Sequence, residues 1–210
     1  MVVVAPVVPD PPQPFDPETI ELPVGETLFR VHDKDRDGCD FNPDIGAPTR
    51  FAFFGDPSVP VLYAAATDRA AIAESLLHDI PMTGGQLMHS AYRDRRMSRL
   101  TTRRDLRLAS LMGLGLRRLG VSADQVTTTR AAHYGRTVLW AQAAHASGFD
   151  GLVYMSRQCN SDRAYVFFGD RANDAFDLDP SYRWNFGDPL EGRPQLVTFC
   201  NTLGVEVFVR

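Results

Sequence analysis

Short apolar runs typical of β-strands alternate with helical patterns along this chain, and this mixture constrains the fold more than any other feature. The strand-like runs, rich in apolar, aromatic and β-branched residues, lie at 27–31, 51–54, 59–64, 152–155, 164–168 and 205–209. Helical spacing of apolar residues is expected at 69–77, 98–119 and 134–147. These elements do not follow a regular strand–helix–strand repeat. We therefore expect an α+β fold, a mixed sheet with flanking helices.

The chain length fits one domain preceded by an arm. With 210 residues, 44% of them apolar, the chain can bury one well-packed core. Residues 1–20 contain six prolines, which fix the backbone and remove hydrogen-bond donors, so this segment is expected to be an extended, weakly ordered arm. Residues 21–210 are assigned to a single domain.

Charge and cysteine content exclude several classes of protein. The net charge of −4 makes direct binding to nucleic acid an unattractive hypothesis. Three cysteines without a CxxC pair indicate a reducing compartment. The first residues lack the features of a signal peptide, and no apolar run is long enough to span a membrane. The expected location is the cytoplasm.

One stretch of the chain is strongly basic. Between Arg93 and Arg118 there are nine arginines and two aspartates, which gives this region the opposite sign to the whole chain. Interpreted as part of the helix at 98–119, the stretch is either a solvated helix face or a docking surface for an acidic partner. Both interpretations stay open at this point.

An acidic segment at 33–44 resembles half of a calcium-binding loop. Aspartates occupy alternate positions from Asp33 to Asp37, Gly38 follows, and Asp44 stands at the twelfth position. The flanking segments do not fit, because a strand precedes the loop and Pro43 comes directly before the last candidate ligand. The expected structure is an acidic surface loop. The histidines also lack zinc-type spacing, so we expect no metal site.

Several polar residues lie within or at the ends of the apolar strands. Arg30 alternates with Phe29 and Val31, and an arginine in such a strand needs an anionic partner or ligand. Tyr63 lies near the end of the strand at 59–64. Ser156 and Arg157 follow the strand at 152–155, where side chains commonly project into a cleft.

Glu74 lies within the helix predicted at 69–77. Helical periodicity places it away from the stripe of Ile72 and Leu76, so periodicity alone predicts an exposed side chain. A catalytic role for Glu74 requires that its helix borders an open cleft.

The order of these short motifs resembles the RES domain over roughly residues 27–170. The segments that carry the resemblance are Leu28-Phe29-Arg30-Val31, Phe41-Asn42-Pro43, Arg50-Phe51, Leu62-Tyr63-Ala64-Ala65, Ala73-Glu74, Thr137, Trp140-Ala141, Gly148-Phe149-Asp150-Gly151-Leu152-Val153-Tyr154 and Ser156-Arg157. The arginine, glutamate and serine that give the family its name fall on Arg30, Glu74 and Ser156.

The resemblance implies an ADP-ribosyltransferase-like fold and a toxin that is paired with an Xre-type antitoxin, so an oligomer with that antitoxin is expected. It also implies depletion of NAD⁺ through cleavage of the nicotinamide–ribose bond, by hydrolysis or by phosphorolysis. NAD⁺ is then a substrate, inorganic phosphate is an alternative co-substrate to water, and no cofactor is expected.

The same resemblance implies roles for individual residues. Glu74 would stabilise positive charge on the ribose or orient the nucleophile. Arg30 and Arg50 would hold the pyrophosphate or an attacking phosphate. Tyr63 would stack on nicotinamide or bond a ribose hydroxyl. Ser156 would fix the nicotinamide-side ribose.

Arg157 is a further candidate for substrate binding. The acidic stretch at 33–40 departs from the family pattern and leaves open that Arg30 pairs within the protein. Two other functions also stay open. One is transfer of ADP-ribose to a macromolecule. The other is a non-catalytic binding module that docks through the arginine-rich region, for which Glu74→Gln would leave the phenotype unchanged.

Overall fold

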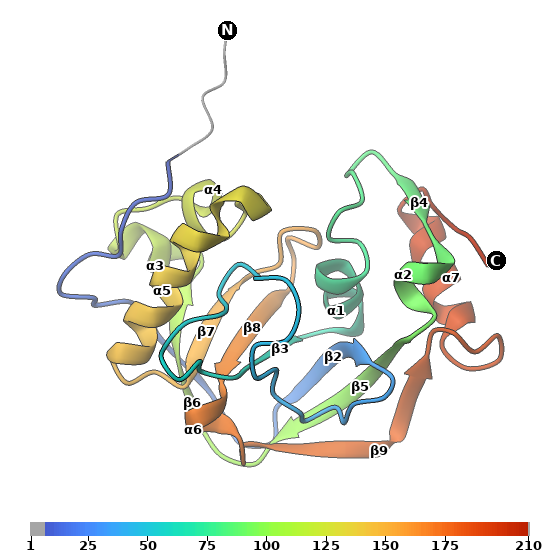
Figure 1. Cartoon of the computed structure of the whole chain (residues 1–210), viewed down its shortest axis with the longest axis horizontal. Helices are drawn as coiled ribbons and strands as arrows, with labels where there is room; N and C mark the ends of the chain where they lie inside the picture. Colours follow the sequence, from blue (N-terminus) through green and yellow to red (C-terminus); the bar gives the residue numbers. More distant parts are fainter. Residues whose placement is uncertain (1–6, 210) are drawn as a thin grey trace, which may run out of the picture.

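The computed structural model describes residues 7–209, and its centre is one curled eight-stranded sheet (Figure 1). The strand order is β1-β6-β7-β8-β3-β2-β5-β9. The strands are β1 Thr19–Leu22, β2 Thr27–Asp33, β3 Val61–Ala65, β5 Arg95–Thr102, β6 Leu106–Leu111, β7 Gly151–Met155, β8 Arg163–Phe168 and β9 Phe176–Asn185. Strands β6 and β7 run parallel, and the other neighbours in this sheet are antiparallel. A small parallel pair joins β4 Gly85–Leu87 to β10 Val205–Val207.

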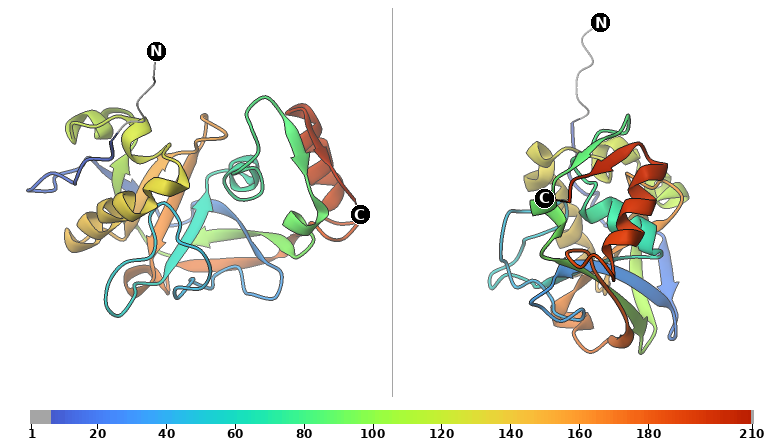
Figure 2. Two further views of the ribbon diagram at one scale, coloured as in Figure 1. Left: turned by 45° about the horizontal axis from the view of Figure 1, so that its top comes forward. Right: turned by 90° about the vertical axis from the view of Figure 1, so that its right-hand side faces the viewer.

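Helices cover the sheet in two groups. The helical elements are α1 Asp68–Ser75, α2 His89–Tyr92, α3 Gly113–Arg118, α4 Ala123–Val126, η1 Ala131–His133, α5 Tyr134–Ala146, α6 Gly169–Ala172 and α7 Arg193–Thr202. Helices α3, α4 and α5 gather over β6, β7 and β8, and α1, α2 and α7 gather at the other end (Figures 1 and 2). The expected α+β fold with a mixed sheet and flanking helices is confirmed.

The two helix groups each close a part of the core. Trp140 and Ala141 of α5 are fully buried in a cluster that also contains Leu152 and Val166 of the sheet. A separate cluster contains buried residues of α1, such as Ile72, and of α7, such as Leu196. A third cluster contains residues from strands between β1 and β9 and includes Leu62. Burial of these apolar surfaces is the main force that holds the helices on the sheet.

Most of the predicted elements are found where the pattern placed them. The strands β2, β3, β7, β8 and β10 overlap the predicted runs, and α5 begins at the expected residue, Tyr134. Gly148 follows α5 with φ of +83°, which is the left-handed conformation that favours glycine after a helix. Helix α1 begins at Asp68, and the residue that caps it is Thr67, whose hydroxyl accepts a hydrogen bond of 3.1 Å from the Ala70 amide.

The helix predicted at 98–119 is wrong. The segment forms β5, a turn, β6 and only then the short helix α3. Ser98, Leu100 and Thr102 are buried at every second position of β5, whereas β6 is buried along its length except at Arg107. This period of two residues belongs to strands, and arginine and leucine, which favour helices, concealed it.

The strand predicted at 51–54 is also wrong. The segment lies in a loop, where an isolated bridge joins Thr49 to Ala52. Phe51 is fully buried and Phe54 is nearly so, and both belong to the cluster around Trp140. The aromatic residues fill the core from a loop, so the apolar run has no strand partner.

The structure differs from the expectation of a weakly ordered arm for residues 7–20. Val8 is 2% exposed, and the indole nitrogen of Trp140 donates a hydrogen bond of 3.0 Å to the carbonyl of Pro9. The ring of Phe15 meets Trp140 edge-on, and β1 pairs with β6. An extended proline-rich backbone fits along this surface because it needs few internal hydrogen bonds. Residues 1–6 of the predicted arm lie outside the described residues.

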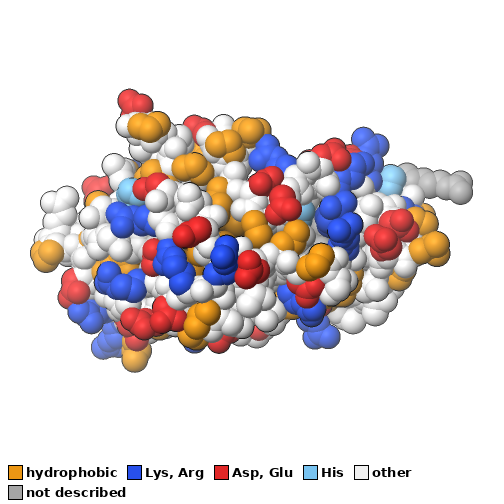
Figure 3. Space-filling view, turned by 90° about the horizontal axis from the view of Figure 1, so that it is seen from below, with side chains coloured by type: hydrophobic (Ala, Val, Ile, Leu, Met, Phe, Trp, Pro, Cys, Tyr) orange, Lys and Arg blue, Asp and Glu red, His pale blue; other side chains and the backbone are white. Residues whose placement is uncertain are grey.

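The arginine-rich stretch is spread over several elements, so a single charged helix face does not exist. Arg93 pairs with the adjacent Asp94, and other arginines of the stretch pair with aspartates from other segments: Arg99 with Asp179, Arg103 with Asp177, Arg104 with Asp150 and Asp174, and Arg118 with Asp16. Figure 3 shows acidic and basic side chains intermixed over one face of the molecule. Within residues 7–209 there is no helix with the length and hydrophobicity that a membrane span requires.

Candidate active site

Glu74 lies in the last turn of α1, and the fold turns it inward. The preceding residues Ala70 to Ala73 are buried against the core, which fixes the rotation of the helix. The Glu74 side chain is only 15% exposed. The periodicity-based expectation of an exposed Glu74 is therefore wrong, because the segment that follows β7 packs against this part of the helix.

Two donors from that segment hold one oxygen of the Glu74 carboxylate. Oε1 accepts a hydrogen bond of 2.8 Å from the Ser156 hydroxyl and another of 2.8 Å from the Arg157 backbone amide. Ser156 is fully buried, and its hydroxyl oxygen accepts a hydrogen bond of 3.1 Å from the Cys159 amide. The Ser156 hydroxyl thus has a defined direction, and it fixes the orientation of the carboxylate.

The other carboxylate oxygen faces Arg50. The distance between Oε2 of Glu74 and Nη1 of Arg50 is 3.9 Å, and the Arg50 side chain is 4% exposed. The guanidinium lies 5.7 Å from the centre of the Tyr134 ring and 3.4 Å from the carbonyl of Thr129. A buried guanidinium with so few strong acceptors depends on the Glu74 charge.

Two tyrosines complete the surroundings of the carboxylate. Burial raises the pKa of Tyr154 well above its ordinary value, and the charge of Glu74 adds to this effect. The Tyr134 hydroxyl lies 2.9 Å from Nε2 of His78. Neither Tyr134, Tyr154 nor His78 was a candidate in the sequence, because aromatic residues inside apolar elements are ordinarily core residues.

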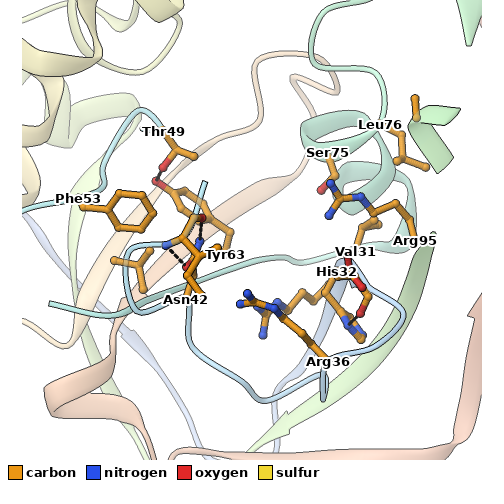
Figure 4. Close-up of a pocket in the computed structure, with 15 residues that line it drawn as sticks. Val31, His32, Arg36, Asn42, Thr49, Phe53, Tyr63, Ser75, Leu76 and Arg95 are labelled. Atoms are coloured by element: carbon orange, nitrogen blue, oxygen red, sulfur yellow. Dashed lines mark hydrogen bonds between the residues drawn. The ribbon is translucent and has the colours of Figure 1, made fainter. Parts of the chain in front are cut away.

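A cavity of about 430 Å³ lies next to the recess that contains Glu74, and Figure 4 shows residues that line the cavity. Its lining includes Arg30, Tyr63 and Ser75, and these three residues also border a smaller recess that contains Glu74. Phe53 and Tyr63 lie on one side of the cavity, and arginine side chains reach in from the other side (Figure 4). The cavity thus has aromatic rings on one side and cationic side chains on the other.

Arg30 points from β2 toward the loop at 34–41. Its Nη1 donates hydrogen bonds of 2.7 Å to the carbonyl of Gly38 and 2.6 Å to the carbonyl of Asp40. The possibility that Arg30 pairs within the protein is thus confirmed, through carbonyls instead of a carboxylate. Burial lowers the pKa of Arg30 to about 10, so the side chain remains charged at neutral pH. Gly38 permits this approach, since a Cβ atom there would lie 2.8 Å from Ser98 and Leu178 atoms.

The Tyr63 hydroxyl is engaged by the neighbouring loop. It lies 2.9 Å from the Thr49 hydroxyl and accepts a hydrogen bond of 3.1 Å from the Phe51 amide. Burial raises the pKa of Tyr63 to about 12, so the phenol is neutral at physiological pH. The ring therefore remains as the part of Tyr63 that meets a ligand in the cavity.

The structure separates the sequence candidates into two groups. Glu74 and Ser156 are in direct contact, and Arg50 faces Glu74 from the other side. Arg30 and Tyr63 border the same recess as Glu74. The Arg157 backbone reaches Glu74, whereas its side chain is exposed.

Other cavity residues were not candidates. Arg36 belongs to the segment interpreted as an acidic loop, and Arg95 to the arginine-rich stretch interpreted as a helix. The apolar residues of β5 are three positions apart in the sequence, so no period of two residues was present to identify a strand that begins at Arg95. Phe53 and Thr49 lie in a long loop, and the sequence contains no signal that brings this loop to the cavity.

The aspartates of the acidic loop bind the backbone of their own loop. Asp33 accepts from the Asp35 amide at 3.0 Å, Asp37 from the Cys39 amide at 2.8 Å, and Asp40 from the Asp37 amide at 2.9 Å. Among residues 7–209 there is no group of three or more histidine, cysteine, aspartate or glutamate side chains arranged to hold a metal ion. These hydrogen bonds stabilise the conformation of the loop whose carbonyl groups bind Arg30.

Comparison with known proteins identifies the fold and the family of this chain. The structure is similar to a chain in the crystal structure of the M. tuberculosis MbcT-MbcA toxin-antitoxin complex, with a TM-score of 0.53, 14% sequence identity, and coverage of 88% of this chain and 91% of that chain. This similarity shows a shared fold. Comparison with curated proteins returns no match. The model of the RES domain matches residues 27–187, and the chain therefore belongs to the RES-domain family.

Proposed function

We propose that this chain is the toxin of a toxin–antitoxin pair and that it degrades NAD⁺ by cleaving the nicotinamide–ribose bond. Membership in the RES-domain family supports this proposal, and so does the shared fold with a chain of a toxin–antitoxin complex. The observation that carries it is the Glu74 carboxylate, which is held in a fixed direction by Ser156 and Arg157 in a recess that joins the larger cavity.

The reaction needs a carboxylate at this place. When the C1″–N bond breaks, its electron pair leaves with the neutral nicotinamide, and the ribose develops oxocarbenium character. A carboxylate beside C1″ stabilises this positive charge, because it is already oriented and largely screened from water. Water or phosphate then forms the new bond to C1″ and releases one proton, which gives ADP-ribose or its 1″-phosphate.

The residues around Glu74 have different roles in the proposed reaction. Ser156, the Arg157 amide and Arg50 act on the carboxylate and are assigned as positioning groups. The faces of Tyr63 and Phe53 offer an aromatic wall for the nicotinamide ring. Arg30 is charged and lines both the cavity and the recess with Glu74, and it is assigned to the phosphate next to the reacting ribose.

A test compares the wild-type chain with Glu74→Gln and with Glu191→Gln, a control that neutralises an exposed glutamate. Expression of the wild type and of the control is expected to arrest bacterial growth and to drain NAD⁺, because both keep the carboxylate at the site. Glu74→Gln is expected to lose about a thousandfold or more of the activity, since it removes the charge that stabilises the transition state. Growth arrest with a constant NAD⁺ pool would overturn the proposal.

Product analysis identifies the acceptor. The purified chain is incubated with NAD⁺, with and without inorganic phosphate, and the products are separated by chromatography. We expect phosphate to accelerate turnover and to yield ADP-ribose 1″-phosphate, because several arginines line the cavity. Rates that do not respond to phosphate would identify water as the acceptor, and ADP-ribose attached to protein would identify a transferase.

The partner in this proposal is an Xre-type antitoxin, and the complex acts in the cytoplasm. The arginine-rich stretch offers no continuous helix face for it, because its charges are spread over several elements and many are paired. Co-expression with the product of a neighbouring gene is expected to restore growth and to yield a co-purifying complex. If no neighbouring gene encodes a protein that restores growth, the antitoxin part of the proposal fails.

A further inference from the structure

Three arginines line the large cavity, and the side chains of two of them have no hydrogen-bond or ion-pair partner among residues 7–209. Arg30 donates to loop carbonyls, as described above. Within residues 7–209, Arg36 and Arg95 form no ion pair, whereas Arg93, Arg99, Arg103, Arg104 and Arg118 each do. A pair of unpartnered guanidinium groups on the wall of one cavity is suited to bind an anion.

Arg36 is unpaired although aspartates surround it in the sequence. The carboxylates of Asp33, Asp37 and Asp40 accept hydrogen bonds from backbone amides of the same loop. Lys34, the other cation of this segment, pairs with Asp94 at 2.7 Å. None of these contacts involves the Arg36 guanidinium, and the Arg36 side chain extends into the cavity (Figure 4).

Arg95 reaches the cavity from a different element. It is the first residue of β5, where it lies opposite Asp33 of β2 in the strand register. Its side chain extends toward Ser75 at the end of α1 (Figure 4). His32 also lines this side of the cavity, and burial lowers its pKa to about 4, so at neutral pH it adds a polar ring without charge. The residues that line the cavity include one carboxylate, Asp33, and three arginines, so the charge of the lining is positive.

We propose that Arg36 and Arg95 form a binding site for a phosphate group, on the side of the cavity opposite Tyr63 and Phe53. Guanidinium groups bind phosphate through forked, charge-assisted hydrogen bonds, and two of them on separate elements can clamp one phosphoryl or pyrophosphoryl group. The natural source of the phosphate rests on the proposed function. It is either the pyrophosphate of the dinucleotide or free inorganic phosphate.

The position of the pair favours the dinucleotide. Arg30 lines both the cavity and the recess with Glu74. Arg36 and Arg95 line the cavity but not the recess. An acceptor phosphate has to reach the carbon beside Glu74. The pyrophosphate of the ADP-ribose half lies farther from this carbon along the substrate, on the side where Arg36 and Arg95 line the cavity.

The test measures binding without turnover. Isothermal titration with inorganic pyrophosphate is carried out on the wild type, Arg36→Gln, Arg95→Gln, the double variant and Arg117→Gln. Arg117 is an exposed arginine on α3, distant in the fold from the cavity, and its replacement is the matched control. Thermal unfolding verifies that each variant folds. We expect each single replacement in the pair to weaken binding about tenfold, because each removes one charge-assisted contact.

The double variant is expected to lose binding by about a hundredfold, and the control is expected to match the wild type. No binding of pyrophosphate to the wild type, or equal affinity in the wild type and the folded double variant, would overturn the proposal. If pyrophosphate binds through this pair but NAD⁺ is not cleaved, the phosphate site stands and the proposed function fails.

Kinetics of the same variants identify the source of the phosphate. A raised KM for NAD⁺ with an unchanged KM for inorganic phosphate assigns the pair to the dinucleotide. A raised KM for inorganic phosphate with an unchanged KM for NAD⁺ assigns the pair to the acceptor phosphate. If NAD⁺ is cleaved and both constants are unchanged in the double variant, the site does not serve the reaction and the proposal is overturned.

Discussion

The Ser156 hydroxyl donates a hydrogen bond of 2.8 Å to Oε1 of Glu74, across 82 positions of the sequence. This bond joins the end of β7 to the last turn of α1, and the Arg157 amide adds a second donor to the same oxygen. The carboxylate is thereby held in one orientation before any substrate arrives. Such preorganisation is the main contribution that a protein makes to a reaction with a charged transition state.

Replacement of Ser156 by alanine tests this role. The substitution removes one of the two donors to Oε1 and is expected to lower kcat about 10- to 100-fold while KM for NAD⁺ changes little, because the serine acts on Glu74 and is itself fully buried. Steady-state kinetics with NAD⁺ provide the measurement. Ser161→Ala is the control, since Ser161 lies in the same segment and bonds Asp162. A large rise in KM with unchanged kcat would instead place Ser156 in substrate binding.

Replacement of Arg50 by lysine tests whether the buried guanidinium positions Glu74. Lysine keeps the charge but loses the planar fork and the contact with the Tyr134 ring. We expect kcat to fall about tenfold or more and the free energy of unfolding to fall by about 1–3 kcal/mol, because the site is 4% exposed. Kinetics and urea unfolding provide the measurements.

The control for Arg50 is Arg118→Lys, at an exposed ion pair with Asp16. Exposed pairs contribute little, so this variant is expected to match the wild type in both measurements. If Arg50→Lys raised KM alone and left stability unchanged, Arg50 would belong to the substrate contacts.

His32 is expected to make stability depend on pH. Burial lowers the pKa of His32 from its ordinary value of 6.5 to about 4, so between these values the unfolded chain binds the proton and the folded chain does not. The stability contribution is complete above about pH 6.5 and is lost as the pH falls to about 4, with a change of about 1–3 kcal/mol.

The measurement compares urea unfolding of the wild type and of His32→Gln at several pH values. Glutamine can still bond the Ser98 hydroxyl, which lies 2.8 Å from Nε2 of His32, but it does not titrate. The variant is expected to lose less stability than the wild type between pH 7 and pH 4. Parallel curves for the two proteins would contradict the burial of a neutral His32.

The packing of the N-terminal segment is tested by Val8→Asp. A charge at this buried position opposes the contact of residues 7–16 with α5. The free energy of unfolding is therefore expected to fall by about 1–3 kcal/mol, and proteases are expected to cut near Pro9 sooner. Val7→Asp is the control, because Val7 is 76% exposed. Equal protease sensitivity of both variants and the wild type would mean that this segment adds nothing to the domain.

Local patterns predicted much of this molecule. The apolar runs at β2, β3, β7 and β8, and the helical spacing of α5, were strong enough to place these elements. The same local reasoning failed at 98–119, where residues that favour helices form β5 and β6. This segment forms strands because β5 pairs with β2 and β6 pairs with β7, and such pairing depends on residues far away in the chain.

The sequence by itself determined the class of fold and, through short motifs in a fixed order, the family with its arginine, glutamate and serine. Only the tertiary structure decided that Glu74 faces Ser156 and Arg50, against the helical periodicity of its own segment. It also decided that the acidic loop binds Arg30 through carbonyl groups and leaves Arg36 unpaired. The physical reason is that burial and hydrogen bonding depend on which segments meet in space, and a periodic pattern within one segment carries no information about its neighbours.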